Sequence, residues 1–241
     1  MASRYFSGLF VLAAALATVS RISVAETPLP SEKAAVQSFI QAASKDNAAG
    51  IRSLVDRDSR YWNSGVLETA IAQNREDIAK ILIAHHVNVN ARPPLQDFPH
   101  ASGVKQMASP LESAVLGGEV KIAKILLKAG AKPGAALADA VSNPKASISA
   151  RDREAMVLLL LRHGANPNSE SGGLTALDWA SANGYTRIVK ILLKRGADVD
   201  ATKGKPANAL KVARANGHWD IARLLEAARK SKKSVKKGPR P

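Results

Sequence analysis

The side chains able to do chemistry are few and scattered along the chain. Cysteine is absent, which excludes disulfides, thiolate zinc sites and a cysteine nucleophile. The five histidines are His85, His86, His100, His163 and His218. Only the first three could meet, and no carboxylate has the spacing that would complete a metal site with them. No H-E-x-x-H, P-loop, G-x-S-x-G or strand-borne G-x-G-x-x-G motif occurs either. We therefore expect no metal, no cofactor, no catalytic residues and no enzymatic activity.

Three acidic residues recur at equivalent positions of similar segments: Glu68, Glu112 and Asp178. Asp178 lies three residues after Thr175, and Glu112 three residues after Ser109, which is the spacing of a helix capping box. Because the spacing repeats along the chain, these carboxylates should sit at successive helix N-termini and should not converge as an acid–base pair. At the corresponding position of the last segment stands Lys211, so we expect its helix to begin less firmly.

The segment 174–201 shows the elements that position these caps. A short helix from Thr175 is broken at Gly184, and a second helix shows an apolar face at Ile188, Ile191 and Leu192. Gly196 follows as a left-handed C-cap. The segment 109–131 repeats the pattern, with breaks at its own glycines. Such a helix–turn–helix exposes apolar surface that it cannot bury alone, so it needs neighbouring copies.

These two segments resemble the ankyrin repeat, whose signature is T-P-L-H-x-A and whose period is about 33 residues. The family's His is replaced by the three acids and by Lys211. The resemblance extends over residues 32–228. It implies an all-α ankyrin-repeat solenoid of about six stacked helix–turn–helix units, the first and last acting as caps. The first-helix positions that mark the units are Ile40, Leu67, Leu111, Leu137, Leu177 and Leu210.

Two insertions interrupt the repeat spacing. Residues 92–108 form a finger loop that is longer than usual; it is either a functional loop or an insertion that folds back and buries Phe98. Residues 142–150 separate the helices of the fourth unit, where Pro144 stops the first helix and Ser149 with Asp152 can cap the second. This insertion is either a contact site or a tolerated surface loop.

Residues 1–25 have the pattern of a secretory signal. Arg4 precedes an apolar run at 8–19 that is too short to span a bilayer, and Ser23-Val24-Ala25 has the form of a cleavage site. We expect cleavage between Ala25 and Glu26, although an uncleaved anchor or a buried first helix would fit the same residues. Residues 26–31 then form a linker. The mature protein should be periplasmic or secreted, without a transmembrane segment after signal removal.

The formal charge of +15 is concentrated at the C-terminus. We expect residues 229–241 to form a basic, disordered tail. The tail could be a solvated end, could bind an anionic surface such as phospholipid head groups, or could bind nucleic acid. The signal pattern and the lack of an aromatic residue in the tail disfavour nucleic acid. The cations of this tail are Arg229, Lys230, Lys232, Lys233, Lys236, Lys237 and Arg240.

The ankyrin resemblance implies a protein partner, bound by the finger loops and the first-helix face. The finger positions are Leu95, Phe98, His100, Glu170, Leu174, Lys203 and Lys205, and the helix-face positions are Thr69, Gln73, Ser113 and Trp179. Trp179 is either an interface anchor or a core residue. We expect a monomeric, exported adaptor or inhibitor that binds another envelope protein. The alternative is a structural protein held at an anionic surface by its tail.

Overall fold

The computed structural model describes residues 66–92, 108–142, 148–202 and 208–236. The chain divides between Ala131 and Lys132 into two compact units, called unit 1 and unit 2 below. The predicted signal, the linker and the first repeat lie outside the described residues. Within the described ranges, no helix is both long enough and apolar enough to cross a membrane.

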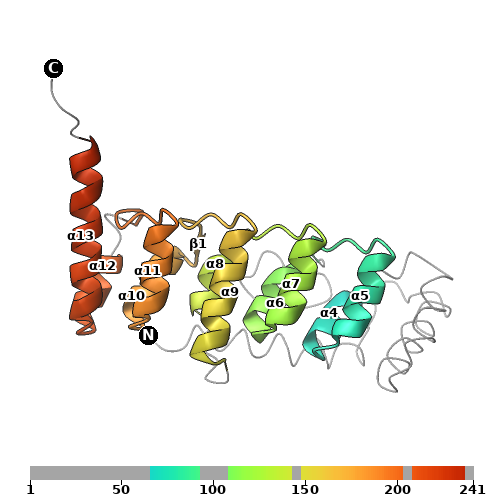
Figure 1. Cartoon of the computed structure of the whole chain (residues 1–241). Coiled ribbons are helices and arrows are strands. Elements are labelled where there is room, and N and C mark those ends of the chain that lie inside the picture. Colours follow the sequence, from blue (N-terminus) through green and yellow to red (C-terminus); the bar gives the residue numbers. More distant parts are fainter. Residues whose placement is uncertain (1–65, 93–107, 143–147, 203–207, 237–241) are drawn as a thin grey trace, which may run out of the picture. The chain divides into compact units, whose positions relative to one another are not determined.

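The described part of unit 1 contains two helical hairpins (Figure 1). The first joins α4 (Val66–Ala72) to α5 (Glu76–Ala84), and the second joins α6 (Pro110–Gly117) to α7 (Val120–Lys128). The hairpins stack, because α4 contacts α6 and α5 contacts α7. Their helices bury the aliphatic side chains of Leu67, Ile78, Leu82, Leu111, Ile122 and Leu126 completely. Each hairpin thus covers the apolar face that its neighbour could not bury alone.

Unit 2 repeats this arrangement with three hairpins in its described part. Its helices are α8 (Ala136–Ser142), α9 (Ala150–Arg162), α10 (Ala176–Ala182), α11 (Thr186–Lys194), α12 (Ala209–Ala215) and α13 (Trp219–Lys236). The central first helix, α10, packs against both α8 and α12, and the central second helix, α11, packs against both α9 and α13. Between α9 and α10 lies a two-stranded antiparallel ribbon, β1 (Glu170–Ser171) and β2 (Leu174–Thr175).

The predicted capping boxes are present at α6 and α10. At α10, the backbone N–H of Asp178 donates to Thr175 Oγ1 at 3.2 Å, and the backbone N–H of Thr175 donates to Asp178 Oδ2 at 2.9 Å. Ser109 and Glu112 make the same reciprocal pair at α6. Each box satisfies N–H groups that the first turn of a helix otherwise leaves without a partner.

The last repeat also begins with a cap, which the reasoning from Lys211 did not predict. Asn208 Oδ1 accepts the backbone N–H of Lys211 at 3.0 Å, which is one of the two bonds of a capping box; the reciprocal bond would need an acid at position 211. Asparagine is among the best N-cap residues, because its side chain reaches the N–H groups of the first turn. The start of α12 therefore depends on Asn208.

The turns after the second helices require a left-handed residue. Gly130, Gly164 and Gly196 have φ of 89°, 83° and 85° at the three turns where the sequence has glycine. His86 takes the equivalent place after α5 with φ 64°. This agrees with the observation that histidine is enriched among the non-glycine residues found in this region.

The fourth repeat keeps its two helices together across the insertion. α8 ends at Ser142 and α9 begins at Ala150, while residues 143–147 lie outside the described part. Ser149 caps α9 as predicted, with its Oγ accepting the N–H of Asp152 at 3.0 Å. Arg153 is 5% exposed, donates to the carbonyl of Ala140 at 3.1 Å, and lies 5.2 Å from the centroid of the Tyr185 ring. The guanidinium therefore satisfies a carbonyl near the end of α8.

The capping acids give a prediction about pH. Burial raises the pKa of Glu68 above its ordinary value of 4.5. A carboxyl whose pKa is higher in the folded state costs stability as the pH rises from its unfolded pKa through its folded pKa. Glu68→Gln should therefore raise the thermal midpoint at neutral pH and have little effect at pH 4.

Asp178→Asn is the matched comparison. It should lower stability by about 1–3 kcal/mol at neutral pH, because Asp178 is 3% exposed and its carboxylate accepts bonds that an amide cannot all replace. Thermal unfolding of both variants between pH 4 and pH 8 tests the pair. Equal effects of the two substitutions would show that the two carboxyls do not differ in environment.

Candidate functional site

The connection after each of three second helices is built on the same side-chain turn. Asn88 Oδ1 accepts the N–H of Asn90 at 3.0 Å, and Asn166 Oδ1 accepts the N–H of Asn168 at 2.9 Å. Asp198 Oδ1 accepts the N–H of Asp200 at 3.0 Å. Asparagine and aspartate favour such turns because their short side chains reach the backbone two residues on. Three connections therefore leave their helices in the same conformation.

The second polar residue of each turn also makes a longer-range bond. Asn90 Nδ2 donates to the carbonyl of Gly130 at 3.2 Å in unit 1. In unit 2, Asn168 Oδ1 accepts the N–H of Asp198 at 2.7 Å. These residues are 40 and 30 positions apart in sequence, so the bonds tie the turn of one repeat to the turn of the next. These turns, which we call the finger bases because the fingers follow them, are thus fixed relative to one another within each unit.

The finger between α9 and α10 is a β-hairpin. Glu170 pairs with Thr175 and Ser171 with Leu174. Gly172 and Gly173 at its tip have φ of 61° and 81°, which is the pair of left-handed residues that a two-residue hairpin turn of the favoured hand requires. Glu170 is exposed and Leu174 is half-buried. The two residues predicted to lie on this finger are thus presented by an ordered element.

Two capping carboxylates also bind the residues that directly precede two of the predicted fingers. Arg92 Nη2 lies 2.6 Å from Glu112 Oε1, directly before residues 93–107. Thr202 Oγ1 donates to Asp178 Oδ1 at 3.0 Å, directly before residues 203–207. Sequence reasoning assigned these acids to helix capping alone. One signal for this second role was available in the sequence. It is the acid that replaces the family's His, together with a cation or hydroxyl just before the neighbouring finger.

The predicted binding residues are only partly within the described ranges. On the first-helix face, Gln73 is exposed, whereas Ser113 and Trp179 are half-buried. Thr69 lies on α4, and its side chain is not among those described. The finger residues Leu95, Phe98, His100, Lys203 and Lys205 lie outside the described residues.

Trp179, which the sequence left open as an interface anchor or a core residue, is half-buried. It lies on α10, whose neighbours on either side are α8 and α12, and its side chain is neither fully buried nor fully exposed. Its carbonyl accepts the backbone N–H of Asn183 at 3.0 Å and the side-chain Nδ2 of Asn183 at 2.9 Å. The backbone of the residue is thus held by the helix; the indole Nε1 is buried, while part of the residue remains open to solvent.

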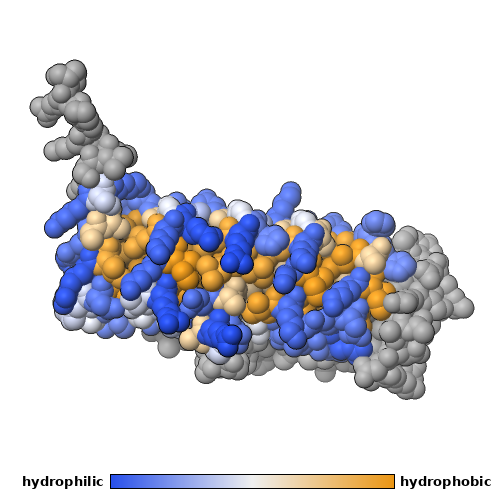
Figure 2. Space-filling model, viewed as in Figure 1, coloured by the Kyte–Doolittle hydropathy of each residue, from blue (hydrophilic) through white to orange (hydrophobic). Residues whose placement is uncertain are grey.

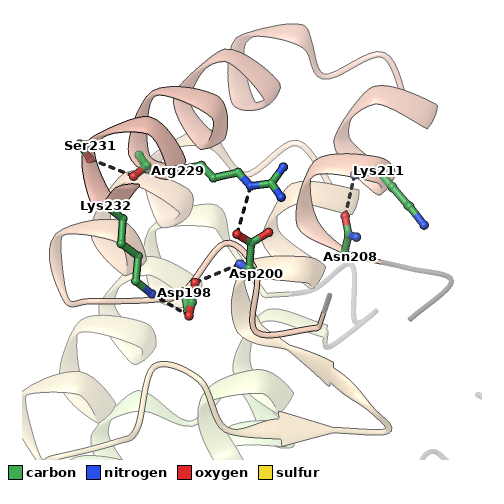
Figure 3. Close-up of polar contacts among 8 residues, drawn as sticks. Asp198, Asp200, Asn208, Lys211, Arg229, Ser231 and Lys232 are labelled. Atoms are coloured by element: carbon green, nitrogen blue, oxygen red, sulfur yellow. Dashed lines mark hydrogen bonds and ion pairs between the residues drawn. The ribbon is translucent and has the colours of Figure 1, made fainter. Parts of the chain in front are cut away.

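Helix α13 continues to Lys236, whereas the sequence predicts disorder from Arg229 on (Figure 3). Arg229 Nε donates to Asp200 Oδ2 at 3.0 Å, and Lys232 Nζ lies 2.7 Å from Asp198 Oδ2. Asp200 is equivalent to Asn168 of the preceding repeat, and Asn168 bonds to the turn that follows it. Cations of α13 therefore take the place of the turn that follows the second helix in the earlier repeats. Two cations of the predicted tail are thus paired with carboxylates of the protein itself. The signal for this was the pair of acids at the turn positions where the earlier repeats have asparagines.

The described polar side chains do not suggest a reaction centre. Within the described ranges, no three His, Asp or Glu side chains gather as metal ligands would. His85, His86 and His163 are exposed and lie at the ends of second helices. What the geometry offers is a set of ordered turns, a hairpin and a partly open tryptophan, which are means of contacting another macromolecule.

Comparison with known proteins agrees with this arrangement. The sequence model of the ankyrin repeats, in three copies, matches residues 142–203. Cyclin-dependent kinase 4 inhibitor B of Rattus norvegicus is 32% identical over 120 residues, which are 49% of this chain and 91% of that protein. The chain therefore belongs to the ankyrin repeat family, and the predicted all-α solenoid of helix–turn–helix units is confirmed. Ankyrin repeats mediate protein–protein interaction, and the match indicates no enzyme family.

Two longer relatives contain only a short stretch like this chain. The Ankyrin repeat and KH domain-containing protein mask-1 of Caenorhabditis elegans is 29% identical over 161 residues, 66% of this chain and 6% of that protein. The Ankyrin repeat protein nuc-2 of Neurospora crassa is 29% identical over 184 residues, 75% of this chain and 16% of that protein. The shared feature is the repeat array, a small part of either relative.

The ion pairs of α13 give a second prediction. Arg229→Ala/Lys232→Ala should speed amide hydrogen exchange over residues 229–236, because the end of the helix loses its link to the last described turn. Exposed ion pairs contribute up to about 1 kcal/mol each, so protection should fall by up to about fivefold per pair. High salt should have a similar effect in the parent protein.

Arg223→Ala/Lys230→Ala is the matched control. Both residues are exposed on the same helix, and neither has an ion pair within the described part of the chain. This variant removes the same charge and should leave the exchange at 229–236 nearly unchanged. Similar exchange in the two double variants would mean that the ion pairs do not hold the helix end.

Proposed function

We propose that this chain is an exported adaptor or inhibitor that binds another envelope protein through its finger loops and the face of its first helices. The observation that carries the proposal is the fixed presentation of the finger bases. The turns of neighbouring repeats are bonded to each other through Asn90 and Asn168, and a β-hairpin stands between α9 and α10. A partner that docks on such a surface loses little free energy to ordering it.

Trp179 is the candidate anchor of this surface. Tryptophan is enriched among the few interface residues that dominate binding free energy, because a large, rigid side chain can be buried at little entropic cost. The half-buried Leu174 on the neighbouring hairpin precedes the same helix by two residues. An aromatic and an aliphatic side chain, both partly open and both on ordered elements, support a contact site with a central apolar part.

Export and the inhibitor role have separate support. The charged start, short apolar run and small-x-small site of residues 1–25 favour export. One relative, of which this chain covers 91%, is named an inhibitor of a cyclin-dependent kinase. An ankyrin array of this length can therefore be sufficient for an inhibitor. The alternative, a tail that binds an anionic surface, has less support because Arg229 and Lys232 are paired with carboxylates of the protein itself.

The proposed anchor can be tested by capture. The chain is immobilised on a support and exposed to envelope extract at high salt. It should retain a partner in stoichiometric amount. Trp179→Ala should weaken that binding by about tenfold or more, which is the usual effect of truncating a central interface aromatic. Titration calorimetry with the purified partner measures the change.

Trp219→Ala is the control for the loss of a tryptophan, because Trp219 is 59% exposed and lies on α13 at the start of a second helix. It should leave the affinity for the captured protein unchanged. Full affinity of a folded Trp179→Ala variant would contradict the proposed binding face. Folding is checked by the thermal midpoint of each variant.

Export has its own measurement. When the full chain is expressed in a Gram-negative host, mass spectrometry of the purified protein should find Glu26 as the first residue, in the periplasmic fraction. Ala25→Arg should leave the signal attached, because signal cleavage requires a small residue at that position. An intact N-terminus on cytoplasmic protein would count against the exported role and would leave the binding face as a separate question.

A further inference from the structure

The second helices of unit 2 form a row with one face turned to solvent. α11 contacts α9 on one side and α13 on the other, so the three helices stand side by side (Figure 1). Figure 2 shows hydrophilic columns on this face, separated by apolar surface. The row is made by second helices, which contain none of the residues predicted to contact a protein partner; α13 also includes residues 229–236 of the predicted basic tail. We call it the outer face of unit 2.

The exposed residues of the outer face recur at helical spacing. On α11 they are Arg187, Lys190 and Lys194, which lie three and four residues apart and hence on one line of the helix. On α13 the line consists of Trp219, Arg223, Ala227 and Lys230. On α9 the exposed cations are Arg151 and Arg162, near either end of the helix. Each helix therefore adds cations to the same face.

Few carboxylates balance this charge. Lys190, Lys194 and Arg223 have no ion pair within the described residues, and Arg187, whose side chain is 87% exposed, lies 3.7 Å from Glu154 Oε2. The exposed acids of the three helices are Asp152 and Asp220, and Asp220 accepts a hydrogen bond from Thr186 Oγ1 at 2.7 Å. The α11 helix itself contains no acid. The outer face therefore has an excess of positive charge.

Apolar side chains lie between the cations. Leu158 on α9, Ile191 on α11 and Leu224 on α13 are half-buried, and Trp219 is exposed at the start of α13. Lysine and arginine side chains can lie along such apolar surface while the charged group reaches outward. Tryptophan is the residue enriched at the boundary between lipid and water, where its ring sits among the head groups.

We propose that the outer face of unit 2 binds the surface of a bilayer that contains anionic lipids. The cations spread across three adjacent helices, which matches a charged plane better than the single line that an extended acidic chain would follow. Each Lys or Arg near an anionic bilayer surface contributes about fivefold to the partition coefficient, and the exposed indole of Trp219 adds contact with the interface. The proposed site shares only Lys230 with the predicted C-terminal tail, and it does not depend on the function of the fingers.

Vesicle sedimentation tests the proposal with the full chain. The protein should pellet with vesicles of phosphatidylcholine and phosphatidylserine, pellet little with phosphatidylcholine alone, and be released by high salt because exposed charges are screened. Lys190→Ala should lower the partition coefficient about fivefold. Lys190→Glu/Lys194→Glu should abolish pelleting. The emission of Trp219 should shift to the blue with anionic vesicles, and Trp219→Phe should remove that shift.

Lys211→Ala is the matched control, since it removes one exposed cation of unit 2 from the first helix α12. It should change binding little. Equal losses for Lys190→Ala and Lys211→Ala would overturn the proposal by showing a response to net charge only. Loss of binding on removing residues 237–241, with Lys190→Ala unaffected, would move the site to the tail. Full competition by soluble polyglutamate without a Trp219 shift would identify an acidic polypeptide as the ligand instead.

Discussion

The repeat array depends on a carboxylate at the start of a first helix. Asp178 and Glu112 are nearly buried, and each closes a capping box with the residue three positions before it. The remaining capacity of each carboxylate is used by Arg92 or Thr202, each the residue directly before a predicted finger. One charged group thus begins a helix and fixes the residue that leads into a predicted finger. Its burial is tolerable only because its oxygens are satisfied by hydrogen bonds.

Local patterns were enough to predict the parts of the structure that depend on neighbours in sequence. The two capping boxes, the cap of α9 by Ser149 and the left-handed residue Gly196 are each decided within four residues, and each was predicted. Repetition of these patterns then identified the family. The hydrophobic periodicity supplied the core, because an apolar helix face has to be covered by the next copy.

The parts that sequence reasoning missed involve residues far apart in the chain. Arg229 and Asp200 are 29 positions apart, and Arg92 and Glu112 are 20 apart. A run of basic residues by itself favours disorder, and only the acids on the last described turn make it favourable for α13 to continue. The cap of α12 was missed for another reason: it depends on Asn208, the residue before the helix, and not on Lys211 at the position of the acids.

The pairing of α13 with the turn at Asp198 and Asp200 has a consequence for assembly. A stack of identical hairpins has an end that resembles its own interior, so one molecule could in principle continue the stack of another, as an uncovered strand can extend a sheet. In the earlier repeats the turn after one second helix bonds to the turn after the next, and a further stacked repeat would continue that pattern. After α13 the described chain stays helical to Lys236, held by Arg229 and Lys232, so an incoming hairpin would not find such a turn to bond to. The same contact that steadies the helix therefore also opposes end-to-end polymerisation.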